Sequence, residues 1–386
     1  MKRRVFLKSA AAGAALLALP GHAAADVAKD GWTPWTAPAL SASADARLRA
    51  LAVAILCPNP QNLQSWRIAF EGDARIVVSA ALDRRLPVSD FPDRQVTVGL
   101  GCFTELLVLA LRAEGYVVEL SPFPEGEAWP MLDERPVAAL QITPGPAVRD
   151  PLLDAVRGRH TNRLPFDRTR VPEPATLALL TAAAHQPGRV HWNINQDRAA
   201  QIRDVTLRAW DVEMLQFAPT REEVARYTRI GDTAIHRRPW GPAVADAALA
   251  RAAGPVSLET LSDPRSPALL GNRAAYRAAV ESGDAHIWIV SPEYDRAGMF
   301  AAGRDWLRLH LLATQMGLAM QPHSQALHDF AQIDPLVREL HEVLGVAAPG
   351  RIQMLGRVGV ALSAVGPSPR ESSTARLQST RSHAPP

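Results

Sequence analysis

An internal echo between two apolar, helix-like stretches constrains the fold of this chain more than any other feature. The stretch GCFTELLVLALRAEGYVV begins at Gly101, and GRDWLRLHLLATQMGLAM begins at Gly303. In each stretch a second glycine follows fourteen residues after the first, at Gly115 and at Gly317, and ends the helix before a short apolar segment. Two core helices can converge on such a pattern, but duplication of a half-fold explains the shared spacing better. We therefore expect two similar halves in one chain.

Strand patterns alternate with helix patterns along the rest of the sequence. Residues 65–80 alternate around an Asp/Gly turn and predict a hairpin, and residues 96–114 predict an apolar helix. The middle of the chain, from about 173 to 283, has weak helical periodicity and is broken by a loop at 236–242. This alternation indicates an α+β or α/β fold. Further elements are expected at 44–55 (helix), 116–120 (strand), 136–143 (strand), 285–291 (strand), 299–318 (helix) and 351–363 (strand).

Arginine carries nearly all of the positive charge. The chain has 386 residues and a formal net charge of +3, which is too small to indicate nucleic-acid binding. Its only lysines are Lys2, Lys8 and Lys29, so the folded body has no lysine for a Schiff base or for a Walker-type phosphate site. A phosphate site must therefore be built from arginine and backbone N–H groups.

The residues that usually bind metals do not form a recognisable pattern. Cys57 and Cys102 are the only cysteines, and their spacing allows a disulfide without requiring one. Cys102 lies in an apolar helical pattern, which favours a buried small residue. The sequence has no H-E-x-x-H, no paired C-x-x-C and no G-x-S-x-G motif, so we expect neither a metal site nor serine-hydrolase chemistry.

The first 25 residues have the layout of an export signal. A basic start is followed by a short Ala/Gly/Leu run and an Ala-x-Ala stop, which predicts cleavage after Ala25. The stretch Arg3-Arg4-Val5-Phe6-Leu7-Lys8 resembles the twin-arginine consensus, although a chance basic start to an ordinary secretory signal is the alternative. We expect export by the twin-arginine (Tat) machinery and a periplasmic protein, with no later membrane span. That pathway carries folded cargo, which favours a bound redox cofactor.

The stretch RHTNRLPFD, at 159–167, is the strongest candidate for an anion site. Arg159, Thr161 and Arg163 recur at every second position, and on an extended or first-turn backbone they would supply a fork of donors. The alternative is a solvated basic turn. The glycines of 99–104 do not form a dinucleotide fingerprint, because they lie within the helix pattern and the third glycine is missing.

Four stretches in order resemble the FMN-dependent nitroreductase family, and especially its duplicated, single-chain, Acg-like branch. The first is CPNPQNLQSWRI, which departs from the family pattern at Cys57, Asn59 and Ser65. The second is RHTNRLPFD, similar to the Arg-x-Ser/Thr-x-Arg signature. The other two are AAGRDWLRLHLLATQMGLAMQPHSQAL (301–327), similar to an Ala-Gly-x-Ala helix running into Gly-Leu-x-x-x-Pro, and MLGRVGVALSAVGPSPR (354–370), similar to a closing Arg-x-Gly strand and Pro-x-Arg end.

The resemblance implies a nitroreductase-like α+β fold with a central, mostly antiparallel sheet flanked by helices, in two half-repeats fused in one chain. It also implies FMN as cofactor. We expect the signal peptide at 1–25, an N-terminal half at 26–150 and a C-terminal half at 151–370 with a helical insertion at about 190–283. Residues 26–43 are expected to form an extended arm, and residues 371–386 a disordered tail.

An FMN site would need a cationic phosphate pocket and amides at the polar edge of the ring. Asn62 and Gln64 suit the ring edge, unless they only cap a turn. The resemblance adds Pro322, His323 and Ser324 beside the ring, and Arg370 with Arg357 at the phosphate. For Arg357 an ordinary ion pair is the alternative, and His323 has no assigned role in proton transfer. The expected cofactor-binding residues are Asn62, Gln64, Arg159, Thr161, Arg163, Pro322, His323, Ser324, Arg357 and Arg370.

Two functions follow from this reading. The first is an FMN-dependent oxidoreductase that passes two electrons to a small acceptor, a nitroaromatic or a quinone. The second is a protein that holds flavin with little turnover, because the periplasm lacks a ready pool of reduced nicotinamide. The chemistry would belong to the flavin, and no catalytic side chain is assigned. The oligomeric state stays open between a single chain that supplies both halves and a homodimer.

Overall fold

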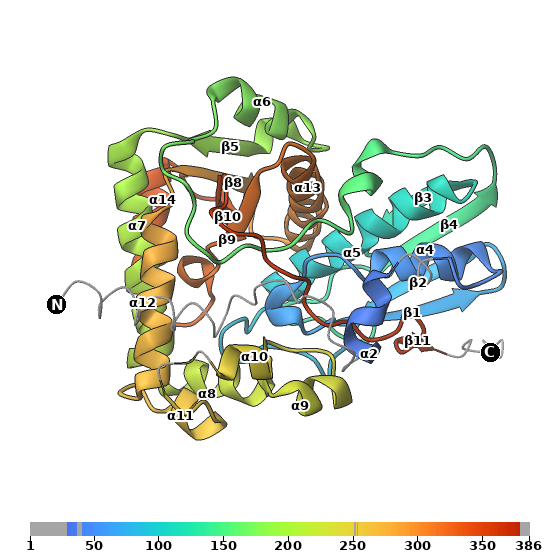
Figure 1. Ribbon diagram of the computed structural model, residues 1–386. Coiled ribbons are helices and arrows are strands. Elements are labelled where there is room, and N and C mark those ends of the chain that lie inside the picture. The colour runs from blue at the N-terminus through green and yellow to red at the C-terminus, as the bar shows by residue number, and fades with distance from the viewer. Residues whose placement is uncertain (1–28, 37–40, 251, 253, 379–386) are drawn as a thin grey trace.

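Two antiparallel four-stranded arrangements with the same strand order form the framework (Figure 1), and a short parallel strand, β11 (Leu377–Gln378), extends the first at β1. The computed structural model describes residues 29–36, 41–250, 252 and 254–378. In the first sheet the order is β1-β2-β4-β3, with β1 Trp66–Glu71, β2 Arg75–Ala80, β3 Tyr116–Pro122 and β4 Pro136–Pro144. In the second it is β5-β8-β10-β9, with β5 Val190–Asn193, β8 Ala285–Ser291, β9 Ala319–Pro322 and β10 Arg351–Gly359. Every neighbouring pair in both orders is antiparallel.

A long apolar helix follows the second strand of each half. These helices are α5 (Arg94–Ala113) and α13 (Arg296–Gln315), and they cross in the centre of the molecule (Figure 1). They touch at the first glycine of each echo, because a Cβ added at Gly101 would lie 2.2 Å from the carbonyl oxygen of Phe300. A Cβ at Gly303 would lie 2.0 Å from the carbonyl oxygen of Val98. No other residue type allows so close an approach.

The second glycine of each echo has the expected role of ending its helix. Gly115 and Gly317 both have positive φ, of 89° and 72°, which is the left-handed conformation that terminates helices. Topology and glycine positions together confirm the predicted α+β fold with two half-repeats.

The halves differ mainly in one connection. Three residues join β1 to β2, whereas residues 194–284 join β5 to β8. This insertion forms an arch of helices along one side and the bottom of Figure 1. Its elements are α7 Gln196–Asp211, η6 Val212–Gln216, α8 Ala218–Tyr227, β6 Arg229–Ile230, α9 Asp232–Arg237, β7 Ala243–Val244, α10 Asp246–Leu249, α11 Leu258–Ser262 and α12 Pro267–Glu281. The loop expected at 236–242 begins only after α9, at residue 238.

Most of the remaining expected elements are present with small shifts at their ends. The helix expected at 44–55 is α4, and the expected hairpin is β1–β2. The short strands β5 and β9 were not predicted. The other elements are α4 Ala46–Ala54, η3 Pro60–Asn62, η4 Pro151–Ala155, α6 Pro174–Ala182, η5 Pro187–Arg189, η7 Gln325–Leu327 and α14 Asp334–Leu344.

Helix α5 is buried on almost every side. Among the described helices it is the one long and apolar enough to cross a membrane, but most of it lies inside the protein, between the first sheet, α4 and α13. Its apolar side chains join those of α13 and both sheets in one large core. The composition of α5 therefore reflects burial in that core.

Both ends of the described chain differ from expectation. The lead-in is not an extended arm, because α2 (Lys29–Trp32) and η2 (Thr33–Trp35) are helical turns and Trp35 is buried. The tail is not disordered over residues 371–378, because β11 (Leu377–Gln378) pairs in parallel with β1. The two ends meet where the Trp35 indole donates to the Ser368 carbonyl at 2.9 Å. The predicted signal peptide and residues 379–386 lie outside the described residues.

Replacing Gly303 by alanine should destabilise the protein, because α5 and α13 would have to move apart. Overpacking of this kind costs about 1–3 kcal/mol or more, which urea denaturation would measure as a lower free energy of unfolding. Gly188→Ala is the matched control, because nothing lies within 4 Å of the Cβ it adds. Wild-type stability in Gly303→Ala would show that the helix crossing does not depend on this contact.

Candidate functional site

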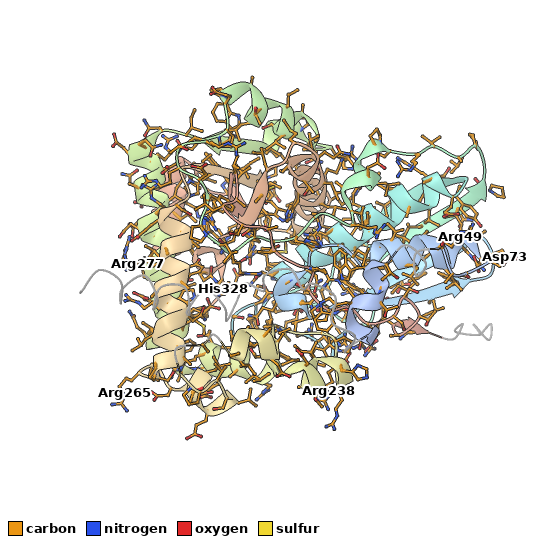
Figure 2. The ribbon with its side chains drawn as sticks, viewed as in Figure 1. Arg49, Asp73, Arg238, Arg265, Arg277 and His328 are labelled. Carbon is orange, nitrogen blue, oxygen red and sulfur yellow. The ribbon has the colours of Figure 1, made fainter. Side chains whose placement is uncertain are left out.

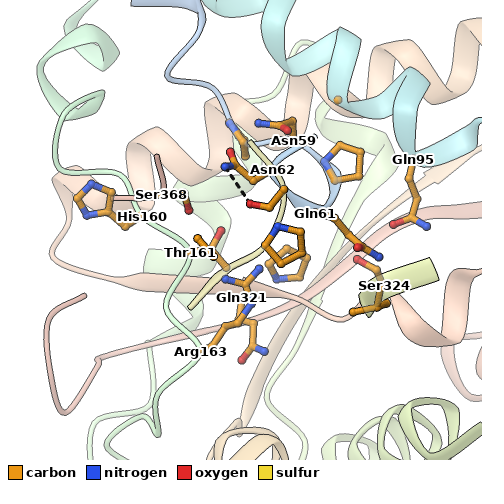
Figure 3. A pocket seen from close by; sticks show the side chains of 18 of the residues that line it. Asn59, Gln61, Asn62, Gln95, His160, Thr161, Arg163, Gln321, Ser324 and Ser368 are labelled. Atoms are coloured by element: carbon orange, nitrogen blue, oxygen red, sulfur yellow. Dashed lines mark hydrogen bonds between the residues drawn. The ribbon is translucent and has the colours of Figure 1, made fainter. Parts of the chain in front are cut away.

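One large cavity is lined by residues of both halves and of the insertion, and Figure 3 shows part of this lining. Its volume is about 280 Å³, far more than the roughly 10–15 Å³ that one buried water needs on the same measure. Its walls come from the loop 58–62, helix α5, the segment 159–163, the insertion, residues 321–325 and residues 365–370. Both half-repeats and the insertion therefore contribute to one site.

The loop that forms one wall has a strained backbone. Gln61, Asn62 and Gln64 have φ values of 45°, 55° and 55°, a region that costs non-glycine residues on the order of 1 kcal/mol each. Side-chain bonds hold this shape: Asn59 accepts from the Gln64 N–H at 2.8 Å. The Gln64 amide donates to the Pro239 carbonyl at 2.8 Å.

These bonds change the roles expected for two residues. Gln64 is buried behind the cavity wall, with its amide committed to Pro239, Pro369 and the Glu371 N–H. Asn62 lines the cavity, but its amide donates to Gly241 and Pro369 and accepts from Arg370. Their amides therefore position the loop, and neither is free for a ligand.

Two other glutamines, Gln61 and Gln95, each have a side-chain amide atom without a hydrogen-bond partner among the described residues. Gln61 Oε1 and Gln95 Nε2 both line the cavity and have no hydrogen-bond partner in the described protein (Figure 3). They provide one acceptor and one donor, which a polar ligand edge can satisfy. Gln61 lies within the quoted motif, next to the residue that was predicted, while nothing in the helical sequence marked Gln95.

The segment 159–163 places three predicted residues at the cavity. Arg159, Thr161 and Arg163 all line it, and no carboxylate in the described residues pairs with either arginine. Arg159 donates to the Leu56 carbonyl at 3.1 Å, and burial lowers the pKa of its guanidinium to about 10. Arg163 makes no hydrogen bond or ion pair with any residue that the structure describes, and burial lowers its pKa as well. Its guanidinium is free to take an anion.

Arg370 and Arg357 are both satisfied by the protein itself. Arg370 lines the cavity, but its guanidinium donates to the carbonyls of Ile55 and Cys57 at 2.8 and 3.0 Å. Arg357 is fully buried outside the cavity wall and bonds to Gln321 at 2.8 Å and to Leu164 at 2.6 Å. The structure therefore does not place Arg357 at the cavity wall, and no acidic side chain among the described residues pairs with it.

The side chains of residues 322–324 point in different directions. Pro322 and Ser324 line the cavity, whereas the His323 ring is fully buried behind them, 5.8 Å from the ring of His286. The His323 N–H donates to the Leu355 carbonyl at 2.8 Å, so this backbone donor is used within the fold. Burial holds the pKa of His323 well below its usual value, which keeps the ring neutral.

The insertion adds a polar group that the sequence analysis missed. Glu213 on η6 and Tyr276 on α12 line the cavity together with Gln325 and His328. Arginines of the insertion such as Arg265 and Arg277 point outward, while His328 lies inside (Figure 2). Burial raises the pKa of the Glu213 carboxyl to about 8, so it is mostly neutral at neutral pH.

The insertion is fastened to the first half by specific contacts. Glu223 on α8 accepts from the Ser89 hydroxyl at 2.6 Å and from the Val88 N–H at 2.9 Å. The Trp240 ring lies between the guanidinium groups of Arg84 and Arg229, at 4.2 and 4.4 Å. The insertion therefore covers the cavity as a closed lid.

The cysteines are free thiols. Cys57 and Cys102 are both buried, as expected for Cys102, and burial raises the pKa of the Cys57 thiol to about 12. A buried, protonated thiol is a poor nucleophile. Within the described residues no group of His, Cys, Asp and Glu side chains could hold a metal ion.

No protein-family model and no curated protein matches the chain. Among solved structures, a nitroreductase-like family protein from Bacillus cereus is 16% identical, covers 60% of this chain and 96% of its own, and has a TM-score of 0.33. A nitroreductase with bound FMN from Bacteroides fragilis NCTC 9343 is 14% identical, with 55% and 89% covered and a TM-score of 0.31. An FMN and NADPH-dependent nitroreductase from Sphigopyxis sp. strain HMH is 13% identical, with 55% and 88% covered and a TM-score of 0.35. All three TM-scores lie below 0.5, and function is therefore inferred from the cavity itself.

The buried acid predicts a pH dependence of stability. Because the pKa of Glu213 is about 8 in the folded protein and 4.5 ordinarily, the native state binds more protons than the unfolded state between these values. Stability should therefore fall as pH rises through this window, by at most about 1.4 kcal/mol per pH unit from this residue. Urea denaturation should show the loss in wild type and in the exposed control Glu222→Gln, and a smaller loss in Glu213→Gln. Parallel curves for all three proteins would contradict the raised pKa.

Proposed function

We propose that the cavity binds FMN and that the protein is an FMN-dependent oxidoreductase. The observation that carries the proposal is the pair of arginines on one extended segment, Arg159 and Arg163, which line the cavity without a carboxylate partner in the described chain. Partly buried positive charge without a counter-charge is costly, and a phosphate dianion supplies the missing charge. Thr161 between them adds a hydroxyl donor.

The rest of the cavity fits a flat ring with a polar edge. Val98, Trp306 and Met354 supply apolar wall, and the unpartnered Gln61 and Gln95 atoms supply an acceptor and a donor. Such an apolar cavity with a few converging polar groups is typical of cofactor sites. When bound, FMN would supply two-electron chemistry, while the chain provides binding, orientation and exclusion of water.

We further propose that the electrons go to a small acceptor, a nitroaromatic or a quinone, and that the protein works in the periplasm after twin-arginine export. The predicted signal supports the location. Both half-repeats line the one cavity, so a single chain can supply a complete site and a homodimer is not required.

A flavin-holding protein with little turnover is the second candidate. The closed lid favours it, because Glu223, Trp240 and the bond from the Gly241 N–H to the Asn62 carbonyl at 2.8 Å all fasten the insertion over the cavity. A lid that stays closed would exclude acceptors as well as water.

Arg163→Ala should weaken FMN binding by about 10–100-fold, because a charge-assisted bond to phosphate contributes roughly 1.5–3 kcal/mol. Riboflavin, which has no phosphate, should lose much less affinity. Quenching of flavin fluorescence during titration measures both. Arg170→Ala, which changes an exposed arginine seven residues later in the chain, is the matched control. Full FMN affinity in Arg163→Ala, or equal losses for FMN and riboflavin, would overturn the assignment of Arg163 to the phosphate.

Reoxidation kinetics should separate the two candidate functions. We expect menadione or a nitroaromatic, added anaerobically, to reoxidise the chemically reduced holoprotein. This reaction should be much faster than reoxidation by dissolved oxygen without the acceptor. Flavin absorbance follows both reactions. Reoxidation no faster than by oxygen would favour flavin storage. Purified protein that contains no flavin and binds none would contradict both.

A further inference from the structure

A buried carboxyl group faces the cavity from the insertion, opposite in character to the arginines of the segment 159–163. Glu213 is 3% exposed and lines the cavity, and its Oε2 has no hydrogen-bond partner in the described chain. It lies on η6, a short π-helical turn between α7 and α8. Such turns are uncommon and occur frequently at functional sites.

Neutral polar side chains lie next to Glu213. The Tyr276 hydroxyl donates to Gln325 Oε1 at 2.9 Å, so the other end of this amide, which carries N–H groups, faces the Glu213 carboxyl. His328 Nδ1 lies 3.8 Å from Glu213 Oε1, too far for a hydrogen bond, and it has no other partner in the described residues. Unsatisfied buried polar atoms of this kind are costly unless a ligand or water completes them.

Among the described residues, no positively charged side chain pairs with the Glu213 carboxyl group. The titratable groups that face it are Glu223 on α8, Tyr276 on α12 and His328 after η7. Burial lowers the pKa of His328 to about 3, so this ring is neutral. Glu223 is a second acidic residue nearby, and its interaction with Glu213 disfavours a negative charge on Glu213. The surroundings therefore keep Glu213 as a carboxylic acid, which can donate a proton.

We propose that Glu213 donates a proton to the oxygen of a neutral carbonyl-type acceptor, such as a quinone, with Gln325 and His328 as its positioning residues. The inference rests on the proposed function and names the acceptor class for the same cavity. A neutral acid and an uncharged imidazole suit an uncharged acceptor, since an anionic acceptor would lower the acidity of Glu213 and meet no cation among these neighbours.

The reduction balances with this one residue. When bound, reduced FMN would supply two electrons and one proton as a hydride equivalent, and Glu213 would supply the second proton that the quinone needs. The Glu213 O–H bond breaks as the new O–H bond forms on the acceptor, which leaves a hydroquinone and a carboxylate. Water reprotonates the carboxylate after the product leaves.

The test compares two oxidants of the chemically reduced holoprotein by anaerobic stopped flow, from about pH 6 to about pH 9. Menadione needs protons on reduction, whereas ferricyanide accepts single electrons and needs none. In wild type and in the control Glu222→Gln, the menadione rate should fall as pH rises through the titration of Glu213, and the ferricyanide rate should not. Glu213→Gln should lower the menadione rate about 100-fold at neutral pH and remove its pH dependence, with ferricyanide unchanged.

Infrared spectroscopy provides a readout apart from turnover. In wild type, the C=O stretch of a protonated carboxylic acid should disappear between neutral and alkaline pH, and the same loss should be smaller in Glu213→Gln, where only other buried acids such as Asp90 contribute. Glu213→Asp keeps the acid on a shorter side chain, so it should retain the pH dependence with a reduced rate. This variant serves if the glutamine variant does not fold.

The outcomes separate the two proposals. Normal flavin content and ferricyanide rates, with a menadione pH profile in Glu213→Gln like that of wild type, would overturn the role of Glu213 alone. Absence of the infrared band of protonated Glu213 at neutral pH would also overturn the role of Glu213 alone. Protein that binds no flavin would overturn the proposed function, and the role of Glu213 with it.

Discussion

The contact between Gly101 and Gly303 is the constraint on which the arrangement of the two halves depends. With no side chain at either position, the backbones of α5 and α13 approach so closely that an added Cβ would overlap a carbonyl oxygen of the other helix. The Cys102 thiol donates to the Gly303 carbonyl at 3.0 Å at the same crossing. Because α5 carries Gln95, and α13 carries Trp306, the crossing also fixes how the two walls of the cavity face each other.

Duplication alone would give the two halves equivalent connections between their first two strands. The insertion makes these two connections different. Where β1 and β2 are joined by a tight turn, β5 and β8 are joined by the helical arch that covers the cavity. The arch brings Glu213 and Tyr276 to the cavity, and the segment 159–163 brings Arg159 and Arg163 to it. Arg163 lies close enough to Tyr276 to affect the pKa of its hydroxyl. The cavity is therefore lined by unpaired arginines from one half and by an acid from the insertion.

The sequence predicted the architecture better than the site. Glycine spacing and alternation depend on short-range geometry, so the paired helices, the hairpin and the half-repeats followed from it. The roles of the amide side chains could not be predicted in this way. Left-handed φ values at Gln61, Asn62 and Gln64 decide which side chain turns toward the cavity. Arginines are also alike in sequence. Only the fold shows that Arg357 bonds to carbonyls and amides, while Arg163 has no hydrogen-bond or ion-pair partner among the described residues. Glu213 could not be predicted, since its importance arises from burial on a π-helical turn.

The charges around the cavity link cofactor binding to folding. Arg370 and Arg357 each offset the cost of burial with bonds to carbonyl oxygens, amides or hydroxyls of the fold. Arg159 does so only in part, and Arg163 not at all within the described chain, so their desolvation is uncompensated in the protein alone. A phosphate-bearing ligand that binds only the folded state would recover this cost and stabilise the fold by mass action. The segment 365–370 also lines the cavity, and its Ser368 carbonyl accepts from the Trp35 indole, so this segment links the cavity to the N-terminal part of the described chain. Loading of the cavity and stabilisation of the fold would then be coupled.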